Sequence, residues 1–350
     1  MQSLKFPQAA RACAALCAAW FAATSLLFTM ASAAFAQSGA PDALLKAARA
    51  EGGFTIYSST NEGLSKALLA AFEREYGIKG TFLRLAQTPL VQRFATEFDA
   101  RRNQADVFSV SSPVPFEMYP QWFAPLGKET VPNLASWPAR WVGKNSFTWT
   151  TDIVVLHYNT DQVTEAAAVK KWADVIDPKW KGKILLTDPR VADNYMGWLD
   201  GLEKRFGMDF LRKISAQDVK LTPSGASGVQ MVAAGAYHMN FPTFPDFATQ
   251  LMEKKAPLAT QNVGDPMFVS LRVVGIVSSA PHPNTARLYL NWLLSQNGIR
   301  TTCRLGRVSV AGDPDGKLGC TPVKELQVVN YTVSEERQQE LLRAIGIVGR

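Results

Sequence analysis

The sequence has few of the residues on which most catalytic and metal sites depend. Its 350 residues include three histidines and four cysteines. It lacks a His-Glu-x-x-His pair, a phosphate-binding glycine loop and a paired-cysteine metal motif, and Gly225-Ala226-Ser227-Gly228 is one residue short of a Gly-x-Ser-x-Gly nucleophile motif. The sequence therefore predicts a protein that is not an enzyme and that needs no cofactor or metal. A secreted hydrolase or lyase using scattered carboxylates is the alternative.

The sequence also lacks a basic cluster. The net charge is +7, but its adjacent basic residues are isolated pairs such as Arg101-Arg102, Lys170-Lys171 and Lys254-Lys255. Nucleic-acid binding usually needs basic residues gathered on one face or stripe. We therefore predict no nucleic-acid partner, and the mild basic excess is compatible with an anionic solute.

Long apolar runs are confined to the N-terminus. Lys5 and Arg11 precede an apolar stretch from residue 12 to residue 36 that ends in Ala34-Phe35-Ala36, a small-x-small pattern typical of signal-peptidase cleavage. A membrane anchor is the alternative, because the stretch is nearly long enough to span a bilayer. The Ala-rich composition favours a signal peptide over residues 1–36, a mature start at Gln37 and a periplasmic, soluble protein.

Removal of that segment would leave two cysteines, Cys303 and Cys320. In an oxidising compartment such a pair normally forms a disulfide. By the loop-entropy argument the bond would stabilise the fold by about 3 kcal/mol. A metal or redox pair would need closer spacing or further ligands, so we predict a structural bridge.

Strands and helices alternate through the first part of the chain. Strands are predicted at 54–57, 81–85 and 106–110, and the helices between them carry apolar residues at helical spacing, with Gly77 as a C-terminal cap. This order indicates an α/β fold with a mostly parallel sheet, which presents ligands at the carboxyl ends of its strands. Those ends carry hydroxyl groups: Ser58, Ser59, Thr60, Ser111 and Ser112.

A second alternating unit follows an irregular, proline-rich connection. One long strand is predicted over 146–158 and another over 184–186, and Ser224 to Gly228 leads into a helix. A strand at 273–277 and a helix at 283–294 follow the second unit in the sequence, and we expect them to pack in the first unit.

Short motifs along the chain carry a resemblance. The run Trp172 to Pro189, with Tyr57-Ser58-Ser59, Ala105-Asp106-Val107, Tyr158-Asn159-Thr160, Ser279 to Asn284 and Trp292 to Ser295, occurs in an order that resembles the periplasmic substrate-binding proteins of ABC importers, in the ferric-iron and small-solute branch. The resemblance extends over nearly the whole chain after the signal segment.

The resemblance implies a two-lobed periplasmic-binding-protein fold (type II) joined by crossing hinge strands, with solute in the cleft. It places lobe one at 37–126 plus 265–298 and lobe two at 127–264 plus 299–350. It also implies a monomer that delivers a small molecule to an inner-membrane ABC permease with its ATPase.

Ferric iron is the alternative ligand, and one segment argues against it. Iron-binding relatives use two adjacent tyrosines, whose phenolates suit a hard trivalent cation. The corresponding stretch here, residues 235–245, has neither that pair nor the acidic residue before it, and Phe241 and Thr243 stand where ligands are expected.

The remaining candidates favour a small organic anion. Serines that precede helices combine free N–H groups with the positive end of a helix dipole, although each could serve only as an N-cap. Arg272 could pair with a carboxylate or phosphonate, or be an ordinary salt-bridged arginine. The further candidate contacts are Asp188, which could be only a turn residue, Tyr195, Ser224, Ser227 and Thr243, with Trp149 and Phe241 as stacking or core aromatics.

Overall fold

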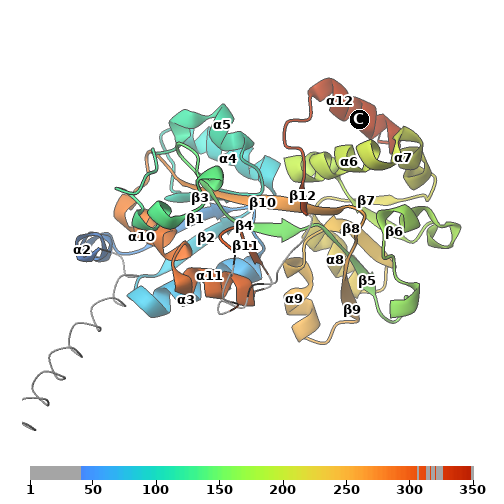
Figure 1. The fold of residues 1–350 in the computed structure, drawn as a ribbon, viewed down its shortest axis with the longest axis horizontal. Helices are drawn as coiled ribbons and strands as arrows, with labels where there is room; N and C mark the ends of the chain where they lie inside the picture. The colour runs from blue at the N-terminus through green and yellow to red at the C-terminus, as the bar shows by residue number, and fades with distance from the viewer. Residues whose placement is uncertain (1–40, 306, 313–315, 317–319, 321–325, 348–350) are drawn as a thin grey trace, which may run out of the picture. The chain divides into compact units, whose positions relative to one another are not determined.

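The computed structural model describes residues 41–305, 307–312, 316, 320 and 326–347. The predicted signal segment 1–36 and Gln37 lie outside the described residues. Two β-sheets organise the described part, and each has helices on its faces (Figure 1).

The first sheet has seven strands among the described residues. The central strands β1, β2 and β3 are parallel, whereas β10 runs antiparallel to both β3 and β4. In spatial order the strands are β11 (Val308–Ser309), β4 (Phe147–Ile153), β10 (Met267–Ile276), β3 (Val107–Val110), β1 (Phe54–Ser58) and β2 (Gly80–Arg84), with β12 (Leu326–Val328) paired to β10.

Two apolar clusters cover the faces of this sheet. Adjacent residues of β1 point to opposite faces, so Ile56 packs in one cluster and Tyr57 in the other. The helices that supply the two clusters are α2 (Asp42–Glu51), α3 (Glu62–Tyr76), α10 (Pro283–Leu293) and α11 (Gln296–Arg304) on one face, and α4 (Gln87–Asp99) and α5 (Val114–Met118) on the other. We call this sheet with its helices the first lobe.

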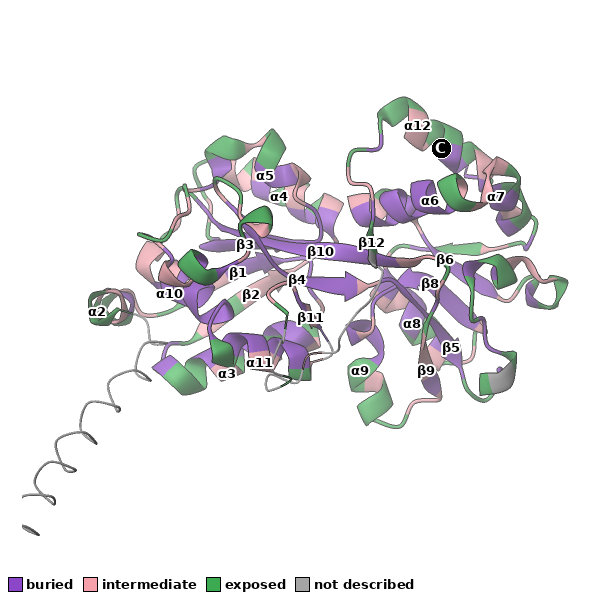
Figure 2. Cartoon of the chain, viewed as in Figure 1, coloured by how far each residue is buried: buried purple, intermediate pink, exposed green. Residues whose placement is uncertain are grey.

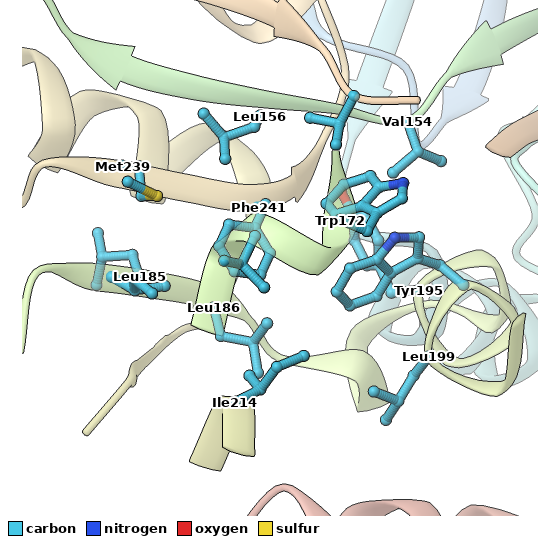
Figure 3. Packing of buried hydrophobic residues seen from close by; sticks show 14 of the residues in the cluster. Val154, Leu156, Trp172, Leu185, Leu186, Tyr195, Leu199, Ile214, Met239 and Phe241 are labelled. Atoms are coloured by element: carbon cyan, nitrogen blue, oxygen red, sulfur yellow. The ribbon is translucent and has the colours of Figure 1, made fainter. Parts of the chain in front are cut away.

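The second sheet has five strands among the described residues, in the order β7 (Lys220–Thr222), β6 (Ile184–Thr187), β8 (Met239–Thr243), β5 (Val155–Asn159) and β9 (Leu258–Asn262). Its helices are α6 (Asp193–Phe206), α7 (Met208–Ser215), α8 (Gly225–Ala233), α9 (Asp246–Glu253) and α12 (Glu335–Ala344). Trp172, Trp198 and Phe241 meet edge to face at its centre. Figure 3 labels Trp172 and Phe241 among the buried residues of this cluster. We call this sheet with its helices the second lobe.

Short 3-10 turns connect these elements: η2 (Pro120–Trp122), η3 (Pro132–Ser136), η4 (Ala139–Trp141), η5 (Glu165–Ala167), η6 (Trp172–Ile176), η7 (Pro178–Trp180) and η8 (Pro189–Val191). The buried residues follow the strands and the inner faces of the helices in both lobes (Figure 2).

The described chain passes between the lobes three times. β4 of the first sheet continues through Val154 into β5 of the second, and β9 leads back to β10. The third passage follows β12, where Val329 packs in the second-lobe core. The two-lobed α/β architecture predicted from the sequence is confirmed.

Two segments pack in a different lobe from the one expected. Residues 127–153 were assigned to the second lobe, yet Val131, Trp137 and Trp149 lie in a first-lobe core and β4 pairs with β10. Residues 299–311 were also assigned there, yet Cys303 packs in that same first-lobe core and β11 pairs with β4. The physical reason is that β4 forms long-range pairs with β10 and β11, which local sequence patterns do not reveal.

The predicted disulfide is confirmed. Cys303 and Cys320 are bonded, with their Cα atoms 4.6 Å apart. Cys303 lies near the end of α11 and is buried in the first lobe. The bond therefore attaches the segment that follows β11 to the first-lobe core.

Candidate functional site

A small cavity lies where the two lobes meet. Its space is about 30 Å³, enough for about two water molecules. The first lobe lines it from the carboxyl ends of β1, β2 and β3, and the second lobe from the starts of α6, α8 and α9. The lining residues are Ser59, Arg84, Ala86, Gln87, Ser111, Val191, Ala192, Asn194, Tyr195, Ser224, Gly225, Phe244, Phe247 and Arg272.

Arg272 on β10 supplies one cationic group. Its Nε donates to the carboxylate of Asp152 on the neighbouring strand β4, and one of its terminal nitrogens donates to Ser59 Oγ at 3.2 Å. Its guanidinium lies 5.4 Å from the centroid of the Phe244 ring. The side chain is fully buried, and burial lowers its pKa. Asp152 thus holds the side chain in position while the guanidinium faces the cavity.

Arg84 supplies a second cationic group, which the sequence analysis did not identify. It is the last residue of β2, and among the described residues its side chain has no hydrogen bond or ion pair. Burial lowers its pKa, and the charge of Arg272 lowers it further, so the two guanidinium groups face the same region. The rule that ligands meet the carboxyl ends of parallel strands would have pointed to Arg84, since residues 81–85 were predicted as a strand.

Hydroxyl and amide groups complete the polar lining. Ser224 is the N-cap of α8, where its Oγ accepts from Ser227 N at 3.1 Å and lies 2.5 Å from Ser227 Oγ. Ser111 Oγ donates to Gln87 Oε1 at 2.8 Å, and Asn194 Nδ2 donates to Ser270 Oγ at 3.1 Å. The cavity therefore offers donors from both lobes.

Aromatic side chains form the second-lobe wall. Tyr195 stacks on Phe244 with ring centroids 5.7 Å apart, and Phe247 lies beside Phe244. Tyr195 is buried, and burial raises the pKa of its hydroxyl above the usual value, so it stays protonated at neutral pH. A neutral hydroxyl can donate a hydrogen bond to a bound anion.

Five of the predicted site residues line this cavity: Ser59, Ser111, Tyr195, Ser224 and Arg272. Ser227 is one step away, bonded to Ser224. The other hydroxyl candidates lie close to the cavity in the chain but are buried in local structure: Ser58 accepts from Thr60 N, and Ser112 accepts from Val114 N. Thr60 and Thr243 are also buried.

Three predicted contacts lie elsewhere. Trp149 packs in a first-lobe core and Phe241 in the second-lobe core, so their core role is the one that the structure supports. Asp188 caps the turn η8, where it binds the backbone and guanidinium of Arg190. The local strand pattern around Trp149 and Phe241 did not show which face of each sheet would be covered by helices.

Further charged groups lie behind the cavity wall. Arg307, which is 2 % exposed, pairs with the carboxylate of Asp152, and its other terminal nitrogen lies 2.8 Å from Asp246 Oδ2 at the start of α9. Burial raises the pKa of Asp246 to about 6. Arg307 belongs to the first lobe and Asp246 to the second, so this ion pair joins the lobes.

A second contact joins the lobes on another side of the cavity. Gln87 Nε2 of the first lobe donates to Asp193 Oδ2 in the first turn of α6 at 2.7 Å. Burial raises the pKa of Asp193. Thr88 Oγ1 also donates to the carbonyl oxygen of Arg190 at 3.4 Å. The cavity is thus flanked by direct protein contacts.

Comparison with known proteins identifies the family of the chain. Residues 57–298 match the family model of the bacterial extracellular solute-binding proteins. The chain belongs to this family. It is a bacterial extracellular solute-binding protein, which agrees with the solute receptor that the sequence predicted.

The relatives of this solute-binding protein differ in what they bind. An Fe(3+)-binding periplasmic protein from Serratia marcescens is 24% identical over 330 residues, covering 87% of this chain and 92% of that protein. The substrate-binding protein of an ABC transporter from Agrobacterium tumefaciens superposes with a TM-score of 0.72 at 15% identity, over 84% of this chain and 93% of that one. AfuA from Actinobacillus pleuropneumoniae, with fructose-6-phosphate bound, gives a TM-score of 0.65 at 19% identity, over 84% and 97%.

The solute-binding protein offers no obvious metal site in the part that the structure describes. No group of three or more His, Cys, Asp or Glu residues is gathered there as metal ligands. Tyr237, the one tyrosine of the segment 235–245, precedes β8. Within these residues no helix is long and apolar enough to cross a membrane.

Proposed function

We propose that this solute-binding protein captures a small organic anion in the cleft between its lobes and delivers it to an ABC permease with its ATPase. The N-terminal segment supports a periplasmic location, and the protein acts as a monomer without turnover of its solute. One observation carries the choice of ligand: two guanidinium groups line the cavity, and no acidic side chain lines it among the described residues.

The electrostatics favour an anion over a bare cation. Arg84 and Arg272 repel positive charge, while Ser59, Ser224 and the Tyr195 hydroxyl can donate hydrogen bonds. Charge-assisted hydrogen bonds from arginine to a carboxylate or phosphate are among the strongest polar contacts in proteins. A cavity of about 30 Å³ is too small for an organic solute, so entry requires the lobes to separate and close again.

A thermal-shift screen of the mature protein tests this proposal. Carboxylates, phosphonates, fructose-6-phosphate, polyamines, ferric citrate and free ferric ion are compared, because a ligand of the native state raises the melting temperature. We expect stabilisation by one of the anions, no release of product, and no colour with free ferric ion. Stabilisation by polyamines or by free iron alone would overturn the proposal.

The Arg84→Gln variant tests whether the anion binds in this cavity. Arg84 has no partner to lose among the described residues, so the variant should melt near the native temperature while its affinity for the anion falls about tenfold or more. Arg93→Gln is the matched control, because Arg93 pairs with Glu97 on the surface of α4 away from the cavity lining. Equal loss in both variants would place the anion elsewhere.

A further inference from the structure

We infer that the cavity selects anions by charge, taking a singly charged organic carboxylate or sulfonate in preference to a dianion of the same size. This inference rests on the proposed function and names its ligand class more narrowly. It follows from how the buried charges around the cavity are paired.

Two of the three arginines near the cavity are already neutralised. Arg272, Asp152, Arg307 and Asp246 form a continuous chain of ion pairs, in which each arginine meets a carboxylate. All four side chains are buried: Arg272 is 1 % exposed, Asp152 and Arg307 are 2 % exposed, and Asp246 is 6 % exposed. The chain holds two positive and two negative charges and contributes no net charge to the cavity.

Arg84 is left as the uncompensated charge. The charged or titratable groups that act on it are Arg272, Tyr195, Asp246 and Glu62. Tyr195 is neutral and Asp246 is paired with Arg307, whereas Glu62 is 60 % exposed and paired with Lys66 on α3. No described group near Arg84 therefore cancels its charge.

Asp193 does not change this balance at the cavity wall. Its carboxylate accepts a hydrogen bond from Gln87 and is not among the lining groups. It lies in the first turn of α6, where the free N–H groups and the helix dipole offset a negative charge locally. The lining itself presents Arg84 and Arg272 alone as charged residues.

A bound anion with a single negative charge balances the charge of Arg84. In a closed site of low dielectric, an isolated charge is unfavourable and a paired one is tolerated. One negative charge pairs with Arg84 and leaves the ion-pair chain undisturbed. A second negative charge lacks a free cation, because the ion-pair chain has no net positive charge to offer it.

Two sulfonates test the inference, because sulfonates stay ionised at every working pH. 3,3-Dimethylbutane-1-sulfonate and 1,2-ethanedisulfonate, which match in size, are titrated into the protein by calorimetry at pH 7, with 4-methylpentanoate and succinate as the carboxylate pair. We expect each monoanion to bind about tenfold or more tightly than its dianion. Equal or tighter binding of both dianions would overturn the inference and leave an anion receptor in place.

The Asp246→Asn variant should weaken the preference for the monoanion. It removes one negative charge from the ion-pair chain, so the cavity gains a second uncompensated cation and the ratio of the two affinities should move about tenfold toward the dianion. Asp209→Asn is the matched control, since Asp209 is an exposed second-lobe carboxylate paired with Arg212, and it should leave the ratio unchanged. An unchanged ratio in folded Asp246→Asn would overturn the inference.

Two further results keep the test decisive. If Asp246→Asn does not fold, Arg84→Gln replaces it: it should weaken binding of the monoanion about tenfold or more without narrowing its advantage over the dianion, while a narrowed advantage would count against the inference. If no anion of any charge binds the native protein, the proposed function itself fails and the charge selection fails with it.

Discussion

Asp246 combines two roles at the scale of a single residue. It is buried in the first turn of α9. It also forms an ion pair with Arg307, the only one described between Arg307 and the second lobe. The charged groups facing it are Arg307, Arg272 and Arg84 of the first lobe, and the backbone N–H of Asn61 points to it as well. Burial is still the larger effect, so the pKa rises to about 6.

We predict that Asp246 makes the protein more stable at acid pH. Its pKa is about 6 in the folded state and close to 4 in an unfolded chain, so the folded state holds the proton more tightly. Its contribution is complete below pH 4 and is lost as the pH rises through 6, by an amount on the order of 3 kcal/mol. Urea unfolding of the native protein and of Asp246→Asn between pH 4 and pH 7 measures it.

The difference in unfolding free energy between the native protein and Asp246→Asn reports the contribution of this carboxylate alone. The unfolding free energy of the native protein should fall relative to that of Asp246→Asn as the pH rises from 4 to 7. Asp209→Asn serves as the reference for a surface carboxylate and should follow the native curve. A native protein that gains stability over Asp246→Asn with rising pH would contradict the prediction.

Some of the site could be predicted from single residues, and some could not. Ser59, Ser111 and Ser224 could be found because they follow strands or precede a helix, which is a local property of the sequence. Arg272 was expected just before a strand at 273–277, whereas it lies within β10. The role of Arg307 could not be found this way, since its partners Asp152 and Asp246 are far from it in the chain. Charge pairing of this kind depends on tertiary contacts that no sequence window contains.

At the scale of elements, local signals located most strands and helices well. β1, β2 and β3 lie within one or two residues of the predicted strands at 54–57, 81–85 and 106–110, and Gly77 caps α3 in the left-handed region at φ 71°. The predicted strand over 146–158 is instead divided into β4 and β5, which belong to different sheets. Both halves have strand periodicity, and only the partner strands decide which sheet each half joins.

Helix α6 shows how closely one element is fitted to another. Gly197 faces the C-terminal segment, and a Cβ atom at this position would lie 1.9 Å from the backbone oxygen of Asn330. A backbone atom cannot move aside as a flexible side chain does. The glycine therefore allows α6 to approach the segment that leads into α12.

We predict that Gly197→Ala destabilises the protein by about 1–3 kcal/mol, because the added methyl group overpacks this contact. Gly264→Ala is the matched control, since a Cβ atom there meets nothing within 4 Å, and it should have little effect. Thermal unfolding of both variants gives the comparison. A Gly197→Ala variant as stable as the control would show that the two segments can separate without cost.

At the scale of the whole molecule, the disulfide joins a late segment of the chain to the first-lobe core. Cys303 is a buried residue of α11, and Arg307 follows it within four residues. The bond thus restrains the part of the chain that supplies the ion pair between the lobes. The sequence predicted the bond from its compartment and cysteine count, but it placed this segment in the other lobe.

We predict that the double variant Cys303→Ser, Cys320→Ser loses about 3 kcal/mol of unfolding free energy, because the unfolded chain regains the freedom of the open loop. Urea denaturation measures the loss. The native protein treated with a reductant should shift to the same midpoint, and the double variant should not respond to the reductant. A double variant with the native midpoint would show that the bond adds no stability.

The contacts that flank the cavity limit how fast a solute can enter or leave it. A solute larger than about two water molecules cannot pass while Gln87 holds Asp193 and Arg307 holds Asp246. Every exchange of solute therefore waits for both contacts to break, and lobe motions of this kind take on the order of microseconds to milliseconds. The residence time of a bound solute is then limited by how often the protein opens, and a solute that stabilises the closed state lengthens its own stay.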